Sequence, residues 1–192
     1  SVERFLTSRR IMYWQVYLHK TVLAAEQMLI KILERARELS TNGREVYAPE
    51  SLRYFLHNTI TKEDFAANPD EQLRRFARLD DTDIASAIKH WQLHSDQMLS
   101  FLAWGLANRQ LFRLEFSSEP FSMTSVEAVR EAVVKHPQIS ATTVDDYLIQ
   151  GKESNSAYTL SSKEILVLTK SGAVVPMSKV SDFGIEPRTF TK

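Results

Sequence analysis

The feature that most restricts the fold of this chain is a stretch from about Val2 to Leu39 that contains neither glycine nor proline. Apolar residues recur through it at the three- and four-residue intervals of an α-helix. Asn42-Gly43 follows, and such a pair is typical of a helix C-terminus. Between Ile11 and Leu18 the pattern is apolar or aromatic nearly all round, so we expect one long helix with this part buried.

Signals for further helices continue as far as residue 113. Each combines a capping residue or a first-turn proline with apolar residues at helical spacing. The start signals are Pro49, Thr61 with Asp64 (a capping box with aspartate in place of glutamate), Asn68-Pro69, Asp80-Asp81, and Ser95 or Asp96 for a last helix through Leu111. Residues 1–116 are therefore predicted to form an all-helical bundle.

The pattern changes after Phe116, where apolar residues begin to alternate over shorter stretches. The predicted elements are a helix capped by Thr124 and Glu127 and ended by His136-Pro137, a strand over 143–149, and a hairpin of strands 164–169 and 173–176 with a proline at its edge. Residues 117–192 thus read as a small α+β subdomain. The predicted fold class is mainly α, a helical bundle followed by this subdomain.

Composition limits the kinds of partner and site. Lysine plus arginine and aspartate plus glutamate each number 24, so no overall charge attracts the chain to nucleic acid or to a membrane surface. There is no cysteine, which excludes thiolate metal sites and cysteine nucleophiles. No apolar run approaches the roughly 18–20 residues of a membrane span, and no signal peptide is visible. We expect a cytoplasmic protein, and the abrupt ends suggest a piece of a longer one.

The first helix carries a row of polar residues that needs an explanation. Arg9, Tyr13 and Tyr17 follow one another at four-residue spacing, and Lys20 falls on the same face of a regular helix, with His19 on the next. A bound phosphate would satisfy the cations, while tyrosine offers a ring and a hydroxyl. The alternative is that the cations pair with carboxylates of the bundle and the tyrosines are core. Spacing alone favours that alternative.

Three other groups are candidates for function, and for each the spacing favours a structural role. Arg109 and Arg113 form an i, i+4 pair at the predicted end of the last bundle helix, where cations suit the helix dipole. Asp80, Asp81 and Asp83 fit capping and first-turn positions better than a metal site. The pair His90 and His94 has the spacing of a zinc-binding HExxH helix but lacks its glutamate and a third ligand.

Three separated motifs resemble the HD-superfamily dNTP triphosphohydrolases. The first is Arg9-Arg10-Ile11-Met12-Tyr13-Trp14-Gln15-Val16-Tyr17-Leu18-His19-Lys20, which matches the family pattern R-x-x-x-[HY]-x-x-x-Y-x-H-K at each position. The second is Leu79-Asp80-Asp81, and the third is Arg109-Gln110-Leu111-Phe112-Arg113, which resembles R-x-L-[FY]-[KR]. The matches occur in the family's order and span about residues 1–116.

The resemblance implies roles for particular residues. It places Arg9 near substrate phosphate and Tyr17 against the sugar, with Tyr13 where the family often has histidine. In nucleotide-activated members the positions of His19, Lys20, Arg109 and Arg113 contribute to an allosteric nucleotide site between subunits. With the resemblance included, substrate binding becomes the favoured interpretation of Arg9 and Tyr17.

The family's catalytic metal is held by an H…HD…D set, and this sequence contains no His-Asp dipeptide. The resemblance therefore implies a fragment of a metal-dependent nucleotide phosphohydrolase that is inactive alone, with no cofactor here and a divalent metal in the parent chain. It would supply a wall of the substrate pocket and an allosteric or oligomer surface, bind a dNTP-like nucleotide in the parent, and form a homo-oligomer. The alternative is a helical interaction or scaffold module without catalysis.

Overall fold

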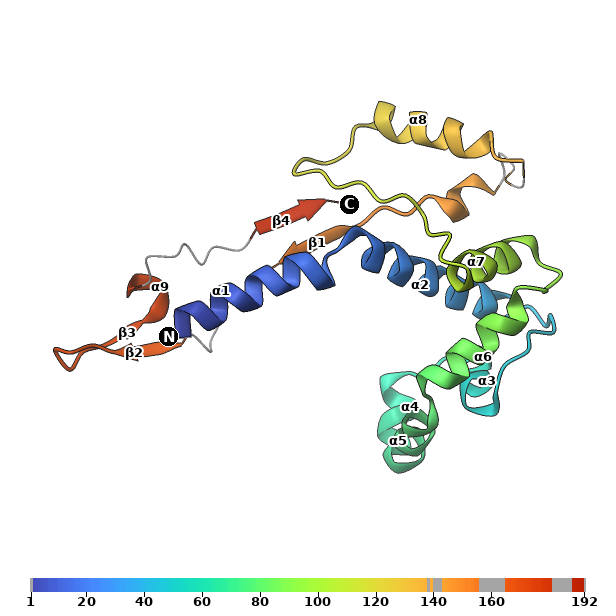
Figure 1. The fold of residues 1–192 in the computed structure, drawn as a ribbon. Coiled ribbons are helices and arrows are strands. Elements are labelled where there is room, and N and C mark those ends of the chain that lie inside the picture. The colour runs from blue at the N-terminus through green and yellow to red at the C-terminus, as the bar shows by residue number, and fades with distance from the viewer. Residues whose placement is uncertain (1, 138, 140–142, 156–164, 181–187, 192) are drawn as a thin grey trace. The chain divides into compact units, whose positions relative to one another are not determined.

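The computed structural model describes residues 2–137, 139, 143–155, 165–180 and 188–191 (Figure 1). The chain divides into two compact units, one of residues 24–113 and the other of residues 1–23 with 114–192. The predicted division was 1–116 and 117–192. The first 23 residues thus group with the C-terminal part of the chain, and the predicted domain boundaries stay a prediction.

The long first helix is interrupted, so the prediction of one continuous helix was wrong. Helix α1 (Val2–Met12) leads into a π-helical turn, η1 (Tyr13–Tyr17), and α2 (Lys20–Thr41) begins after it. The N–H of Leu18 donates to the Tyr13 carbonyl at 2.8 Å, a bond across five residues that widens the turn. Such a turn needs neither glycine nor proline, which explains why the sequence pattern did not reveal it.

The expected burial of residues 11–18 was also wrong. Ile11, Val16 and Tyr17 are 49%, 52% and 53% exposed. A helix that is apolar all round is normally buried, but the other described residues of this chain do not bury residues 11–17.

The unit of residues 24–113 is helical. After α2 it contains α3 (Glu50–His57), α4 (Lys62–Ala67), α5 (Pro69–Arg78), α6 (Asp81–Trp91) and α7 (Gln97–Ala107). Its core consists of buried residues from α2, α3, α6 and α7: Ala24, Met28, Ile32, Ala36, Leu39, Leu52, Leu56, Ala87, Ile88, Trp91, Met98, Leu99, Leu102 and Ala103. The members from α2 recur every three or four residues, as one buried stripe of a helix requires.

Capping chemistry sets most of these helix starts, as predicted. Thr61 with Asp64 and Asp80 with Asp83 form capping boxes, and the Asp96 side chain accepts the Leu99 N–H. Asn68 is an exception, because its side chain makes no capping hydrogen bond. The end of α7 was predicted wrongly: the helix stops at Ala107 and does not reach Leu111.

The C-terminal part differs from the prediction in two of its elements. Helix α8 (Met123–Val134) is capped by Ser122, which accepts the N–H of Ser125, and not by Thr124. The strand predicted over 143–149 is wrong, because Val144–Tyr147 forms a short 3-10 helix, η2. Its Val144 and Tyr147 side chains are both buried, because residues three apart lie on the same side of a 3-10 helix.

The predicted hairpin is confirmed. Strands β2 (Leu166–Leu168) and β3 (Val174–Pro176) pair antiparallel, and Gly172 in the turn has a φ of 84°, which favours glycine. A second antiparallel pair joins β1 (Lys152–Asn155) to β4 (Arg188–Thr191), and a short helix, α9 (Met177–Val180), follows β3. Glu164, the predicted start of the first hairpin strand, lies outside the described residues. The mainly helical fold with small antiparallel pairs confirms the predicted fold class.

No helix among the described residues is long and apolar enough to cross a membrane.

Candidate functional site

The structure brings Arg9, Tyr13 and Tyr17 together in one row. The Arg9 guanidinium carbon lies 5.5 Å from the centroid of the Tyr13 ring, and the Tyr13 and Tyr17 rings are 4.9 Å apart with planes tilted by 42°. Arg9 and Tyr17 are exposed and Tyr13 is half-buried. The predicted shared face of these three residues is therefore present, although a π-turn continues the α-helix across it.

Arg9 interacts with an aromatic ring in this row, not with an acid. Among the described residues no carboxylate forms an ion pair with Arg9, and the same holds for Lys20, whose Nζ lies 5.8 Å from the Phe116 ring centroid. The structural alternative required bundle carboxylates as partners for both cations. In the described part of the chain these cations keep their charge available to an anionic ligand.

His19 has a local structural role at the start of α2. Its carbonyl accepts the N–H of Leu23 at 3.1 Å, and its Nδ1 accepts the N–H of Thr21 at 3.2 Å. The residue therefore caps α2 with both backbone and side chain, as an N-terminal residue can. This use fixes the imidazole beside Lys20 and leaves Nε2 as its free ring nitrogen.

Arg109 and Arg113 are not a pair on one helix, so that prediction is corrected. Helix α7 ends at Ala107, and Arg109 has a φ of 58°, in the left-handed region where glycine is usual. Two hydrogen bonds produce this end: Gln110 N–H to the Gly105 carbonyl at 2.8 Å, and Arg109 N–H to the Leu106 carbonyl at 3.3 Å. This Schellman-type end turns the chain, and both arginines lie exposed beyond the helix.

An arginine is an unexpected residue at that position. A side chain other than glycine in the left-handed region costs about 1 kcal/mol or more. Backbone held in unfavourable conformations is concentrated at functional sites. The left-handed conformation of Arg109 thus supports a role in ligand binding, whereas its spacing from Arg113 in the sequence favoured a structural role.

The three acids Asp80, Asp81 and Asp83 serve α6, as the sequence indicated. One Asp80 oxygen accepts the N–H groups of Thr82 and Asp83 at 2.8 Å and 3.2 Å, and an Asp83 oxygen accepts the Asp80 N–H. Asp81 lies in the first turn, near the positive end of the helix dipole. The described residues include no group of three or more His, Asp or Glu side chains placed to hold a metal ion.

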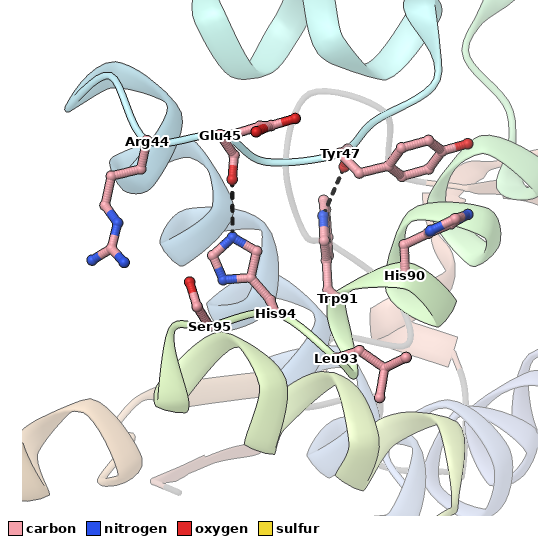
Figure 2. Close-up of a pocket in the computed structure, with 8 residues that line it drawn as sticks. All are labelled: Arg44, Glu45, Tyr47, His90, Trp91, Leu93, His94 and Ser95. Carbon is pink, nitrogen blue, oxygen red and sulfur yellow. Dashed lines mark hydrogen bonds between the residues drawn. The ribbon is translucent and has the colours of Figure 1, made fainter.

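His90 and His94 line a hollow of about 420 Å³ between the segment before α3 and the turn from α6 to α7. Figure 2 shows the two hydrogen bonds that join these segments. The Trp91 indole N–H donates to the Tyr47 carbonyl at 2.7 Å, and His94 Nε2 donates to the Glu45 carbonyl at 3.0 Å.

These contacts give both histidines structural partners. His94 Nδ1 accepts the Asp96 N–H at 2.9 Å, so both of its ring nitrogens are engaged. The His90 ring stacks on the Tyr47 ring with centroids 3.8 Å apart. The four-residue spacing of the histidines therefore serves the junction of the two segments.

Asp96 connects this hollow to the core. Arg35 donates to its two carboxylate oxygens, Nε at 3.1 Å and Nη2 at 2.7 Å, while Leu99 N–H donates at 3.0 Å. Burial raises the pKa of Asp96, but the hydrogen bonds from Arg35 and Leu99 and the charges of Arg35 and His94 outweigh it and hold that pKa below its ordinary value. Hydrogen bonding and the charge of Asp96 raise the pKa of Arg35 in turn. No sequence motif pointed to this pair.

Comparison with known proteins gives the fold a context. No protein-family model matches the chain. YwfO, an uncharacterised protein of Bacillus subtilis, is 34% identical over 133 residues, which are 66% of this chain and 28% of that protein. The crystal structure of a phosphohydrolase from Bacteroides thetaiotaomicron matches 100% of this chain and 48% of its own, with 35% identity and a TM-score of 0.85.

This chain has the fold of part of a phosphohydrolase. It spans less than half the length of either of these two proteins. The matched part is 48% of the solved phosphohydrolase, and the shared fold alone does not assign an activity to this chain.

Proposed function

We propose that this chain forms one wall of the substrate pocket in a metal-dependent phosphohydrolase of the HD superfamily, acting on dNTP-like nucleotides. The observation that carries the proposal is the row of Arg9, Tyr13 and Tyr17, in which Arg9 and Tyr17 are exposed. Arg9 lies beside the Tyr13 ring and forms no ion pair with a carboxylate of the described residues. The likeness to a phosphohydrolase over the whole chain supports it.

The chemistry of the row suits a nucleotide. A guanidinium donates paired hydrogen bonds to phosphate oxygens and keeps its charge at every relevant pH. A tyrosine ring offers an apolar face to a sugar or base, and its hydroxyl donates or accepts one hydrogen bond. The Tyr13 and Tyr17 ring centroids are 4.9 Å apart, so each ring restricts the orientation of the other. In the proposed complex Arg9 would bind the phosphate groups and Tyr17 would pack against the sugar.

The catalytic metal of this proposal lies outside the described residues of the chain. They bring no three metal-ligating side chains together. What the residues of this chain would do is bind and orient: the guanidinium neutralises phosphate charge and the phenol rings fix the sugar. Orientation of this kind supplies a large share of catalysis in phosphoryl transfer.

We further propose that His19 and Lys20, and likewise Arg109 and Arg113, each contribute to regulatory nucleotide binding in the parent protein. Lys20 is held over the Phe116 ring, and Arg109 is exposed in a strained conformation. These features support anion binding at Lys20 and at Arg109.

Calorimetric titration of the chain with dGTP, dATP and inorganic tripolyphosphate, with and without Mg²⁺, tests the proposal. We expect Arg9→Ala to weaken both nucleotides and tripolyphosphate at least about tenfold, as the loss of a charged hydrogen bond does. Tyr17→Ala should weaken the nucleotides and leave tripolyphosphate unchanged. Lys20→Ala should weaken the proposed regulatory binding of nucleotide and leave binding at the Arg9 row unchanged, so this variant distinguishes the two.

Arg53→Ala is the matched control, because it removes an exposed arginine from α3, which belongs to the other compact unit of the chain. Equal losses in Arg9→Ala and Arg53→Ala would show that binding follows net charge only. The parent activity is tested with a longer protein that contains this chain, assayed against a panel of nucleotides in the presence of divalent metal. If every nucleotide stays intact, the result contradicts the proposed phosphohydrolase activity. Absence of binding would favour the helical interaction module.

A further inference from the structure

The π-helical turn η1 interrupts the regular hydrogen bonding of the helix inside the Arg9 row. The Leu18 N–H donates to the Tyr13 carbonyl across five residues, and the His19 N–H donates to the Val16 carbonyl at 3.4 Å before α2 begins. Turns of this kind are rare in proteins, and many of them lie at functional sites. Val16 and Tyr17 are 52% and 53% exposed, so burial against the described residues does not compensate for the irregular bonding.

A regular α-helix would not place Tyr17 in line with Arg9. At about 100° per residue, each step of four residues leads by about 40°, so Tyr17 would lie about 80° around the helix from Arg9. Val16, seven residues after Arg9, would lie within about 20° of it. A regular helix would therefore present a valine, and not a tyrosine, two turns along from the guanidinium.

The π-turn reverses this arrangement. A turn that is closed across five residues contains more than four residues, so each residue advances by less than about 90°. The four residues from Tyr13 to Tyr17 then fall short of a full circle, which cancels the lead gained between Arg9 and Tyr13. The contacts fit this arrangement: the Arg9 guanidinium carbon lies 5.5 Å from the Tyr13 ring centroid, and the centroids of the two tyrosine rings are 4.9 Å apart.

We propose that η1 is a positioning element, which keeps the phenol ring of Tyr17 in line with the Arg9 guanidinium and so matches the row to a ligand with both phosphate and sugar. The inference rests on the proposed function, and it names the backbone feature that makes the row selective. A ligand with phosphate groups alone needs only Arg9, so its binding does not depend on the turn. A nucleotide has to reach from Arg9 to Tyr17, so its binding does.

An exchange of two neighbouring residues tests the role of the turn. The double variant Val16→Tyr, Tyr17→Val keeps the composition and moves the phenol ring by one position, out of line with Arg9. In calorimetric titrations we expect the dissociation constants for dGTP and dATP to rise about tenfold or more, with tripolyphosphate unchanged. In a regular helix the same exchange would bring the phenol ring into line with Arg9. Nucleotide binding that is unchanged or stronger in this variant therefore overturns the proposal.

Two single-residue deletions form a matched pair. Gln15 lies in η1 and Ile11 in the regular helix α1, and both are exposed. Without Gln15 a regular helix places Tyr17 seven residues after Arg9, within about 20° of the line, so nucleotide binding should stay within about threefold. Without Ile11 the Arg9 side chain rotates by about 100° relative to Tyr17, so nucleotides should weaken at least about tenfold while tripolyphosphate does not. Equal losses in the two deletions overturn the proposal.

NMR of the chain without ligand separates this inference from the proposed function. A nuclear Overhauser effect between the Tyr13 α-proton and the Leu18 amide proton, five residues apart, reports the π-turn, and circular dichroism establishes that each variant keeps its helices. We expect the signal in the native chain and its loss on deletion of Gln15. Its absence from the native chain overturns the inference and leaves the proposed function to the titrations. A native chain that has the signal and binds no nucleotide contradicts the proposed function, and the positioning role with it.

Discussion

Arg35 of α2 donates hydrogen bonds to both carboxylate oxygens of Asp96, the residue that caps α7 sixty-one positions later in the chain. Asp96 is 8% exposed. One carboxylate thus starts a helix, neutralises an arginine and joins two helices of the core. Removing a partner from such a pair leaves a charge with poor solvation.

Asp96→Asn should lower the free energy of unfolding by about 2–3 kcal/mol, because Arg35 loses its bidentate acceptor while the cap keeps an oxygen. Urea unfolding followed by circular dichroism measures this, with an unchanged dependence on urea concentration. Glu38→Gln is the control: it removes the other, exposed partner of Arg35, at 2.7 Å, and should cost less than about 1 kcal/mol. Equal effects of the two substitutions would contradict the importance of burial.

The same pair predicts a dependence of stability on pH. The pKa of Asp96 in the folded chain is lower than the ordinary value of 3.8, so folding favours its ionised form. The stabilisation is complete above the pKa of the unfolded carboxyl and is lost as the pH falls through the folded pKa. The difference in unfolding free energy between the native chain and Asp96→Asn should therefore shrink below about pH 4. A difference that stays constant from pH 6 to pH 2.5 would contradict this origin.

Arg109→Gly should stabilise the chain by about 1 kcal/mol, because glycine adopts a φ of 58° without the steric cost of a side chain. Asn108→Gly is the matched control one residue earlier, where φ is −100° and the side chain donates to the Trp104 carbonyl at 2.9 Å. That substitution should destabilise. If Arg109 also binds a nucleotide, Arg109→Gly will raise the melting temperature and weaken binding together.

Gly105→Ala should destabilise the chain by about 1–3 kcal/mol through overpacking. A Cβ at this position would lie 3.0 Å from the Gln110 carbonyl oxygen and 3.1 Å from the Met28 methyl group. The methionine end can move, but the backbone oxygen belongs to the Schellman-type end of α7. Thermal unfolding measures the effect, and Ala85→Gly at an exposed position inside α6 reports the cost of changing only helix propensity, about 1 kcal/mol. A gain in stability for Gly105→Ala would show that this helix end is not tightly packed.

Much of the local structure could be predicted from residues a few positions apart. The capping box at Thr61, the cap at Asp80 and the turn at Gly172 are confirmed, and of the two candidates Ser95 and Asp96 the structure uses Asp96. Each depends on hydrogen bonds or φ preferences within four residues. The alignment of Arg9, Tyr13 and Tyr17 on one face was also predictable from four-residue spacing.

Other features depend on contacts that no short pattern contains. The π-turn at Tyr13–Tyr17, the 3-10 helix at Val144–Tyr147 and the left-handed Arg109 all depart from what their local residues favour. At Val144–Tyr147 the burial of two side chains overrides a propensity of a few tenths of a kcal/mol per residue.

The sequence by itself determined where the helices between residues 50 and 107 begin and which of their faces are apolar. Only the tertiary structure decided which charges are satisfied. It paired Arg35 with Asp96 and placed Lys20 over Phe116. The physical reason is that the cost of an unpaired charge depends on burial and on neighbours distant in sequence, and both exist only once the chain has folded.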